Sequence, residues 1–213
     1  MSTKGIKFLS LIVLFITASV LSSNETFAQM RAGVKGGLNV SNLYIDDIDD
    51  ENARYGFNVG VYGQIFSTDV FAIQPELLLS TKGTRAEYDG IVDQTVKYNL
   101  SYLDLPVLAV FKLGKAAEIY VGPYASYLLN ANMSYSGDLA NGVDEVDKDN
   151  LKSFDYGLVG GFGLNFGMVQ VGARYNYGLV KIADSDGAKL LLGDSKNSVA
   201  QIYLSLNLVK DNN

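Results

Sequence analysis

The chain of 213 residues contains no Cys, no His and no Trp, and its 23 acidic residues exceed its 17 basic residues. Without Cys it can form no disulfides or thiolate ligands, and without His it lacks the commonest nitrogen ligand of zinc. The formal net charge of −6 also argues against nucleic acid as a partner, because phosphate binding needs clustered Lys and Arg.

The N-terminus has the three-part layout of a secretory signal peptide. Lys4 and Lys7 precede the apolar run 8–20, and Thr26-Phe27-Ala28 offers small side chains where a signal peptidase cleaves. An apolar run of about 13 residues is short for a transmembrane anchor. We therefore expect residues 1–28 to be a cleaved signal peptide and residues 29–213 to form one exported domain.

After residue 28, apolar and polar side chains alternate with period two, which is typical of β-strands. Eight segments show the pattern: 31–40, 54–66, 70–82, 96–113, 118–135, 151–166, 169–182 and 198–209. Tight connections at 67–69, 114–117 and 167–168 alternate with long polar ones at 41–53, 83–95, 136–150 and 183–197. Short turns at one end and long loops at the other are typical of outer-membrane barrels. The sequence thus predicts an all-β, eight-stranded antiparallel up-and-down transmembrane β-barrel.

The two faces of each segment differ sharply. In the segment 169–182, Val171, Tyr175 and Tyr177 share one face, whereas Gln170 and Arg174 share the other. The polar faces are rich in Gly and poor in Lys and Glu, unlike the charged surface of a soluble protein. We therefore expect the apolar face to meet lipid and the polar face to line a narrow lumen that side chains fill.

Five charged residues fall on the polar faces of different segments: Lys35, Glu76, Asp104, Asp155 and Arg174. Because an unpaired buried charge is costly, we expect them to form a structural network across the lumen. Arg174 needs an anionic partner, for which Glu76 and Asp104 are the candidates. A gated pore or a proton path is the alternative function of the same residues.

Three prolines lie inside predicted strands, where the missing N–H breaks a ladder bond. They are Pro75, Pro106 and Pro123, each about six to eight residues from a short turn. We expect local bulges at these positions, close to the periplasmic rim.

No catalytic constellation is present, since the usual Ser–His and Cys–His pairs need residues that the chain lacks. The glycine-rich stretch 159–167 has neither the Lys nor the strand–turn–helix context of a phosphate-binding loop. Acidic clusters at 46–51 and 138–149 are either divalent-cation ligands or solvated charges beside a lipopolysaccharide layer. We predict no enzyme activity, no cofactor and no metal site, with a carboxylate-based hydrolase as the remaining enzymatic alternative.

Several stretches resemble the PorT-type outer-membrane β-barrel proteins of Bacteroidetes. They are GVKGGLNVSNL (33–43), IQPELLLSTKG (73–83), YLDLPVLAVFK (102–112), IYVGPYASYLL (119–129), YGLVGGFGLNF (156–166) and VGARYNYGL (171–179). The match runs from about residue 31 to 209. It implies an eight-stranded barrel of OmpA or OmpX size, in a family named after a member needed for protease secretion. One departure is the last segment, which ends at Leu208-Val209 rather than at an aromatic residue.

Together these features predict a small barrel of the cell outer membrane with a structural or interaction role, linked to secretion or surface display. The expected partners are outer-membrane lipid and lipopolysaccharide, the barrel-assembly machinery, and proteins that meet the four long loops. Two alternatives stay open at this point: a soluble periplasmic ligand-binding barrel and a pore for small solutes.

Overall fold

The computed structural model describes residues 31–44, 54–88, 94–137, 142–145, 151–181 and 196–209. The expected signal peptide, the acidic cluster 46–51 and most of the cluster 138–149 lie outside these residues. Within the described ranges, no helix has the length and apolarity needed to cross a membrane.

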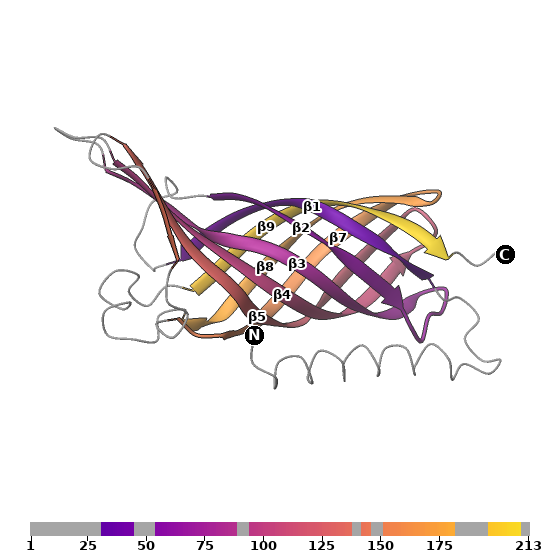
Figure 1. The fold of residues 1–213 in the computed structure, drawn as a ribbon. Helices are drawn as coiled ribbons and strands as arrows, with labels where there is room; N and C mark the ends of the chain where they lie inside the picture. Colours follow the sequence, from indigo (N-terminus) through magenta and orange to yellow (C-terminus); the bar gives the residue numbers. More distant parts are fainter. Residues whose placement is uncertain are drawn as a thin grey trace.

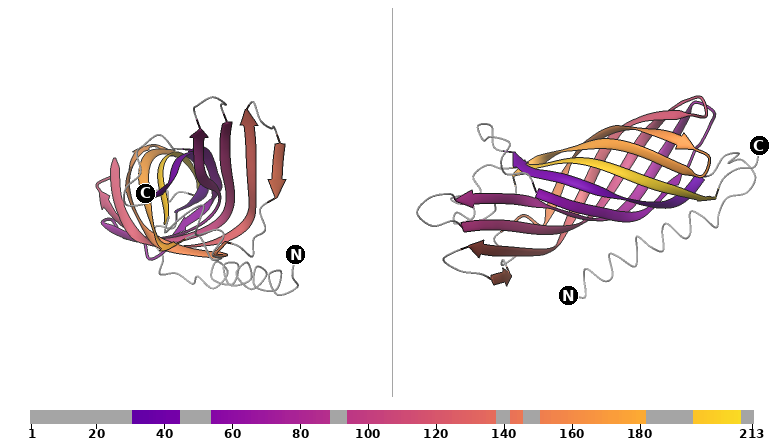
Figure 2. Two further views of the ribbon diagram at one scale, coloured as in Figure 1. Left: turned by 90° about the vertical axis from the view of Figure 1, so that its left-hand side faces the viewer. Right: turned by 90° about the horizontal axis from the view of Figure 1, so that it is seen from above.

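Eight antiparallel strands close into a barrel (Figures 1 and 2). They are β1 (Arg31–Tyr44), β2 (Arg54–Gln64), β3 (Phe71–Tyr88), β4 (Gln94–Leu113), β5 (Ala117–Gly137), β7 (Phe154–Phe166), β8 (Val169–Lys181) and β9 (Lys196–Val209). Each pairs with its neighbours along the chain, and β9 pairs with β1 to complete the ring. A short strand, β6 (Gly142–Glu145), pairs with residues 132–135 near the C-terminal end of β5. The predicted eight-stranded antiparallel barrel is confirmed.

The outer surface of this barrel is apolar and its interior is polar. Leu38, Tyr55 and Ile202 are 70%, 80% and 67% exposed, whereas Lys35 and Glu76 are buried. This reverses the usual distribution in soluble proteins, where charged residues are almost never buried. The prediction that the apolar faces point outward is confirmed. A soluble barrel with an apolar cavity would bury these side chains, so that alternative is wrong.

Tight turns define one end of the barrel, which we call the periplasmic end. Gly114 and Gly167 occupy turns in the left-handed region, with φ of 66° and 67°. The C-terminal end of β9 lies at the same end (Figure 1). Short turns face the periplasm in outer-membrane barrels, so the opposite end, which we call the outer end, faces the exterior.

One predicted loop is mostly strand. The β3–β4 ladder continues without a change of register to Tyr88 and Gln94, although residues 83–95 were expected to form a loop. The β-branched and aromatic residues of these segments favour extended backbone, so the hairpin pairs with itself beyond the barrel wall; they are Thr84, Tyr88, Thr95, Val96 and Tyr98. The loop expected at 136–150 similarly contains β6. The long polar connections expected at 83–95 and 136–150 thus contain paired strand residues within the described ranges.

The prediction of bulges at the prolines is also wrong. Pro75 pairs with Val107, and the register is the same at the next pair, between Leu78 and Asp104. The ladder loses the pairs in between, but the flanking pairs hold the alignment. Pro106 pairs with Tyr124 and Pro123 pairs with Leu158, again with no register shift beside them. The register shifts lie elsewhere, between Ala32 and Gly33, Ser101 and Tyr102, and Tyr177 and Lys181.

Lumen glycines make room for the large side chains beside them. A Cβ on Gly172 of β8 would collide with the ring of Tyr203 and the carbonyl of Phe162, whereas a Cβ on Gly36 of β1 would lie 3.6 Å from the nearest oxygen. We expect Gly172→Ala to lower the free energy of unfolding by about 1–3 kcal/mol, because overpacking displaces its neighbours. The matched control Gly36→Ala should unfold at nearly the parental urea concentration, measured by heat-modifiable gel migration. Equal midpoints for the two variants would contradict this packing.

Candidate functional site

Charged side chains gather in two groups inside the barrel. The inner cluster, nearer the periplasmic end, consists of Lys35, Glu76 and Arg174. The outer cluster consists of Lys82, Asp104 and Asp155. Because strand residues alternate between the two faces, each of these residues points inward from an apolar-out strand.

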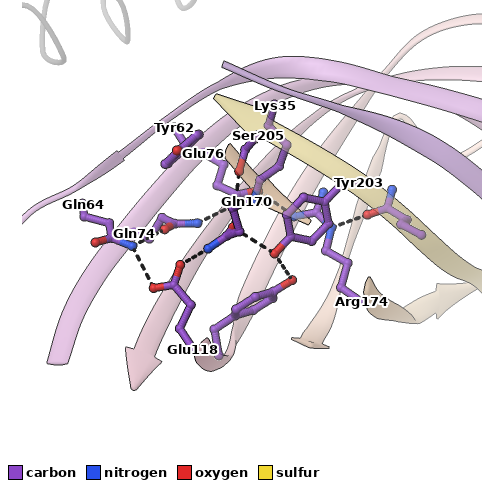
Figure 3. Close-up of polar contacts among 12 residues, drawn as sticks. Lys35, Tyr62, Gln64, Gln74, Glu76, Glu118, Gln170, Arg174, Tyr203 and Ser205 are labelled. Atoms are coloured by element: carbon purple, nitrogen blue, oxygen red, sulfur yellow. Dashed lines mark hydrogen bonds and ion pairs between the residues drawn. The ribbon is translucent and has the colours of Figure 1, made fainter. Parts of the chain in front are cut away.

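The inner cluster is centred on the carboxylate of Glu76. Lys35 Nζ donates to Glu76 Oε1 at 2.5 Å, and Arg174 Nη1 donates to Glu76 Oε2 at 2.6 Å (Figure 3). All three side chains are at most 1% exposed. They come from β1, β3 and β8, so the two ion pairs tie together strands that are not neighbours in the sheet.

Tyrosine rings lie close to both cations of the inner cluster, Lys35 and Arg174. Lys35 Nζ lies 4.3 Å from the ring centroid of Tyr203 and 5.3 Å from that of Tyr62. Arg174 Cζ lies 5.9 Å from the Tyr203 ring. Such cation–π contacts are strongest where water is excluded. They help to offset the excess of two cations over one carboxylate.

Side-chain amides extend the inner cluster around the barrel wall. Gln74 Nε2 donates to Glu76 Oε1 at 2.7 Å, and Gln64 Nε2 donates to Gln74 Oε1 at 2.8 Å. On the other side, Arg174 Nε donates to Gln201 Oε1. Glutamines that both donate and accept thus connect charged groups on several strands into one hydrogen-bonded network.

A further carboxylate, Glu118, lies closer to the periplasmic end. It accepts hydrogen bonds from the side-chain amides of Gln64 and Gln170 (Figure 3). Arg31, whose side chain is 22% exposed, approaches it to 4.0 Å. The Tyr203 hydroxyl donates to Gln170 Oε1 at 3.2 Å and joins this group to the inner cluster.

The outer cluster has the opposite charge balance. Lys82 Nζ donates to Asp104 Oδ1 at 2.8 Å and lies 4.8 Å from the Tyr102 ring centroid. Asp155 Oδ2 accepts from the Tyr124 hydroxyl at 3.2 Å and from Asn197 Nδ2 at 2.8 Å. The cluster thus holds one cation and two carboxylates, and complements the positive inner cluster.

The structure brings together three of the five residues singled out from the sequence. Lys35, Glu76 and Arg174 are in contact, whereas Asp104 pairs with Lys82 and Asp155 binds neutral donors. Sequence reasoning did not include Lys82 or Glu118 among the network residues. The signal for Lys82 was its position. It is the last residue of the predicted segment 70–82 and lies six residues from Glu76, an even separation that puts both side chains on the same face of the strand.

Two apolar clusters pack in the lumen beside the charged groups. One consists of Leu100, Tyr102, Leu128, Ala131 and Leu151; the other consists of Ala72, Leu108, Val110, Tyr120, Tyr124, Val159 and Tyr203. Across the described ranges, no three carboxylates come close enough to share a metal ion. What this arrangement can do is fasten the strands to one another across the lumen.

A family model agrees with a barrel whose apolar face points outward. Residues 22–184 match the family model for an outer membrane protein beta-barrel domain, and no curated protein sequence matches the chain. Three solved structures are similar. Ail of Yersinia pestis is 14% identical, with 84% of this chain and 99% of that chain covered and a TM-score of 0.49. Neisserial surface protein A is 12% identical, with 86% and 100% covered and a TM-score of 0.47. OprG from Pseudomonas aeruginosa is 13% identical, with 84% and 91% covered and a TM-score of 0.35. Since the family model spans well over half of the sequence, the chain belongs to the outer membrane protein beta-barrel domain family, and its location is the cell outer membrane.

Proposed function

We propose that this protein is a non-enzymatic interaction protein, in which a locked barrel holds a small β-sheet outside the cell. The observation that carries the proposal is the unequal length of the strands. Pairing between β2 and β3 ends at Asn58 and Ser80, whereas pairing between β3 and β4 continues to Tyr88 and Gln94. At about 3.4 Å per residue, β3 therefore extends roughly 27 Å beyond its last pair with β2.

The outer parts of β3, β4 and β5, together with β6, form what we call the protruding sheet (Figure 1). Among the described residues, the β2–β3 ladder has no pair beyond Ser80, so the recorded pairs of residues 84–88 of β3 are all with β4. An unpaired strand edge is a ready template for an extended segment of another chain. The protruding sheet is therefore suited to binding a protein partner by strand addition.

The barrel beneath supplies a rigid base for this sheet. The inner cluster ties β1, β3 and β8 together, and the outer cluster ties β3 to β4. Buried ion pairs and amide networks rigidify the elements that they join when their members are satisfied. We propose a structural role for these lumen residues, in place of catalysis or transport.

The finer assignment that we propose is to the PorT-type proteins of Bacteroidetes, with a role in secretion or surface display. The stretches that carry the resemblance also carry the lumen network. IQPELLLSTKG contains Glu76 and Lys82, YLDLPVLAVFK contains Asp104, and VGARYNYGL contains Arg174. The resemblance thus supports a barrel interior that this protein shares with the PorT-type family. The identity of the protein partner would depend on the protruding sheet.

The test is to trim the protruding sheet and leave the barrel intact. We would replace residues 84–98 with an Asn-Gly turn, and use as the control a chain with residues 184–193 removed from another long connection. Heat-modifiable migration would verify that both barrels are folded. Crosslinking on living cells should capture a specific complex with the parental chain and the control, but not with the trimmed chain. A complex that survives trimming would contradict the proposal.

The link to secretion needs a separate measurement. In a strain that lacks this protein, the parental chain should restore the normal set of secreted and surface proteins, and the trimmed chain should not. Full restoration by the trimmed chain would show that the protruding sheet is dispensable for that process. An unchanged set of secreted and surface proteins in the deletion strain would contradict the secretion role.

A further inference from the structure

Two buried carboxylates of the outer cluster each keep one oxygen that has no hydrogen-bond partner among the described residues. These oxygens, which we call the unpaired oxygens, are Asp104 Oδ2 and Asp155 Oδ1. The two residues are only 2% and 3% exposed. The other oxygen of each carboxylate accepts two hydrogen bonds. Buried polar atoms are normally satisfied, so two unpaired carboxylate oxygens in one cluster need an explanation that its own hydrogen bonds do not supply.

Strand register brings the two carboxylates to the same level of the lumen. Asp104 of β4 pairs with Ser126 of β5, and Ser126 pairs in turn with Asp155 of β7. All three residues are buried, and the two negative charges act on each other. Neighbouring strands are about 4.8 Å apart, so the two carboxylates start from backbones about 10 Å apart on a wall that curves toward the lumen. The short side chain of Ser126 lies between them.

The charge balance of the outer cluster indicates the kind of ligand that fits. Lys82 forms an ion pair with Asp104, whereas Asp155 accepts from two neutral donors. Arg174 of the inner cluster is already engaged by Glu76. The outer cluster thus keeps one negative charge for which the described residues supply no contacting cation, and such a buried charge is costly. A water molecule would satisfy the unpaired oxygens and leave that charge, whereas one monovalent cation answers both needs.

We infer that Asp104 and Asp155 bind one small monovalent cation, such as Na⁺, between their unpaired oxygens. Hard cations take oxygen ligands, and the Ser126 hydroxyl adds a neutral oxygen to the two carboxylates. A divalent ion would reverse the net charge of the cluster, and no three acidic side chains of the described ranges are close enough to hold a metal ion together. The inference departs from the sequence-based expectation of no metal site, because the unpaired oxygens depend on how the strands are aligned.

Apolar side chains close the lumen between this site and the outer end. Tyr102, whose ring lies 4.8 Å from Lys82 Nζ, packs with Leu100, Leu128 and Leu151. Leu100 and Leu128 follow Tyr102 and Ser126 toward the outer end of β4 and β5. We therefore expect the cation to enter as the barrel folds and to exchange slowly with the surrounding solution.

Retention of radioactive sodium by the full-length chain tests the inference. The chain is refolded in detergent with ²²NaCl and passed through a gel-filtration column in choline chloride. The parental barrel should retain about one Na⁺ per folded chain, because one positive charge balances the outer cluster. Asp155→Asn should retain at least about tenfold less. The control is Asp69→Asn, which makes the same charge change at an exposed residue of a periplasmic turn and should retain Na⁺ like the parental chain.

Urea unfolding of the parental chain gives a second readout that does not depend on the folding of a variant. A ligand that binds only the folded state stabilises it, so the midpoint should be higher in NaCl than in choline chloride of equal ionic strength. Asp155→Asn should unfold at the same urea concentration in both salts. Equal parental midpoints in the two salts, or no retained Na⁺, would overturn the inference. A larger rise with CaCl₂ than with NaCl at equal ionic strength would also overturn it, since the charge count requires a monovalent ion.

Discussion

Replacing Glu76 with alanine is expected to destabilise the barrel by about 3–5 kcal/mol, the usual cost of leaving buried charge without its partner. Glu76 is the shared acceptor of Lys35 and Arg174, and all three side chains are at most 1% exposed. The substitution therefore leaves two cations in the lumen without their contacting anion. The measurement is the free energy of unfolding from a urea titration in lipid vesicles.

Variants of neighbouring residues separate the charge effect from simple loss of volume. Gln74→Ala removes a buried neutral donor from the adjacent inward position of β3 and should cost about 1–3 kcal/mol. Lys35→Met leaves Glu76 paired with Arg174, so its cost should be smaller than that of Glu76→Ala. If Glu76→Ala costs no more than Gln74→Ala, the ion pairs do not fasten the barrel.

A conductance recording tests the structural role of the same cluster. With its lumen packed by the inner, outer and apolar clusters, the parental chain should show no steady conductance in a planar bilayer. Steady conductance that Glu76→Ala abolishes would contradict this role and support a pore in which Glu76 binds the permeating solute.

The period-two pattern was sufficient to predict which face of each strand points outward. In β8, for example, Gln170 and Arg174 are buried while Val171 and Tyr175 are exposed, as their alternation predicts. The pattern works because a strand has only two faces and the bilayer accepts only one kind of side chain. The prediction of the outward face therefore needs no knowledge of which strands pair with one another.

Contacts across the lumen could not be predicted in the same way, because they depend on register and tilt. Asp104 lies opposite Leu78 in the β3–β4 ladder, yet it bonds to Lys82, four residues further along β3. The tilt of the strands and the length of the lysine side chain bring these two groups together. No pattern within a single segment contains that offset. The sequence therefore offered both Glu76 and Asp104 as partners of Arg174, and Glu76 is the one in contact with it.

The length of the protruding sheet was missed for a related reason. Residues 83–95 were interpreted as a connection, because the stretch is long and polar and alternates with the short turns. Outside the membrane, however, a strand pair can be polar on both faces as long as its backbone groups are paired. The Tyr88–Gln94 pairing satisfies that condition beyond the barrel wall.

Introducing arginine at the middle of a lipid-facing row is the second change from which we expect a large effect. Leu204 lies near the centre of the outward row of β9 and is 58% exposed to the surroundings of the barrel. Leu204→Arg should lower the free energy of unfolding in lipid vesicles by about 2–4 kcal/mol, because the guanidinium must enter the hydrocarbon core.

The matched control is Leu208→Arg, four residues along the same row and 61% exposed, at the periplasmic end. It should cost only about 0–1 kcal/mol, because the guanidinium reaches the interface there. The two positions have the same residue type and similar exposure, so a difference between them measures depth in the bilayer. Equal costs at the two positions, or no cost at Leu204, would contradict the placement of this row in the membrane. Arginine at Ser198, at the outer end of the same row, should also be tolerated, because the ten residue steps from Ser198 to Leu208 span roughly 26 Å across the membrane.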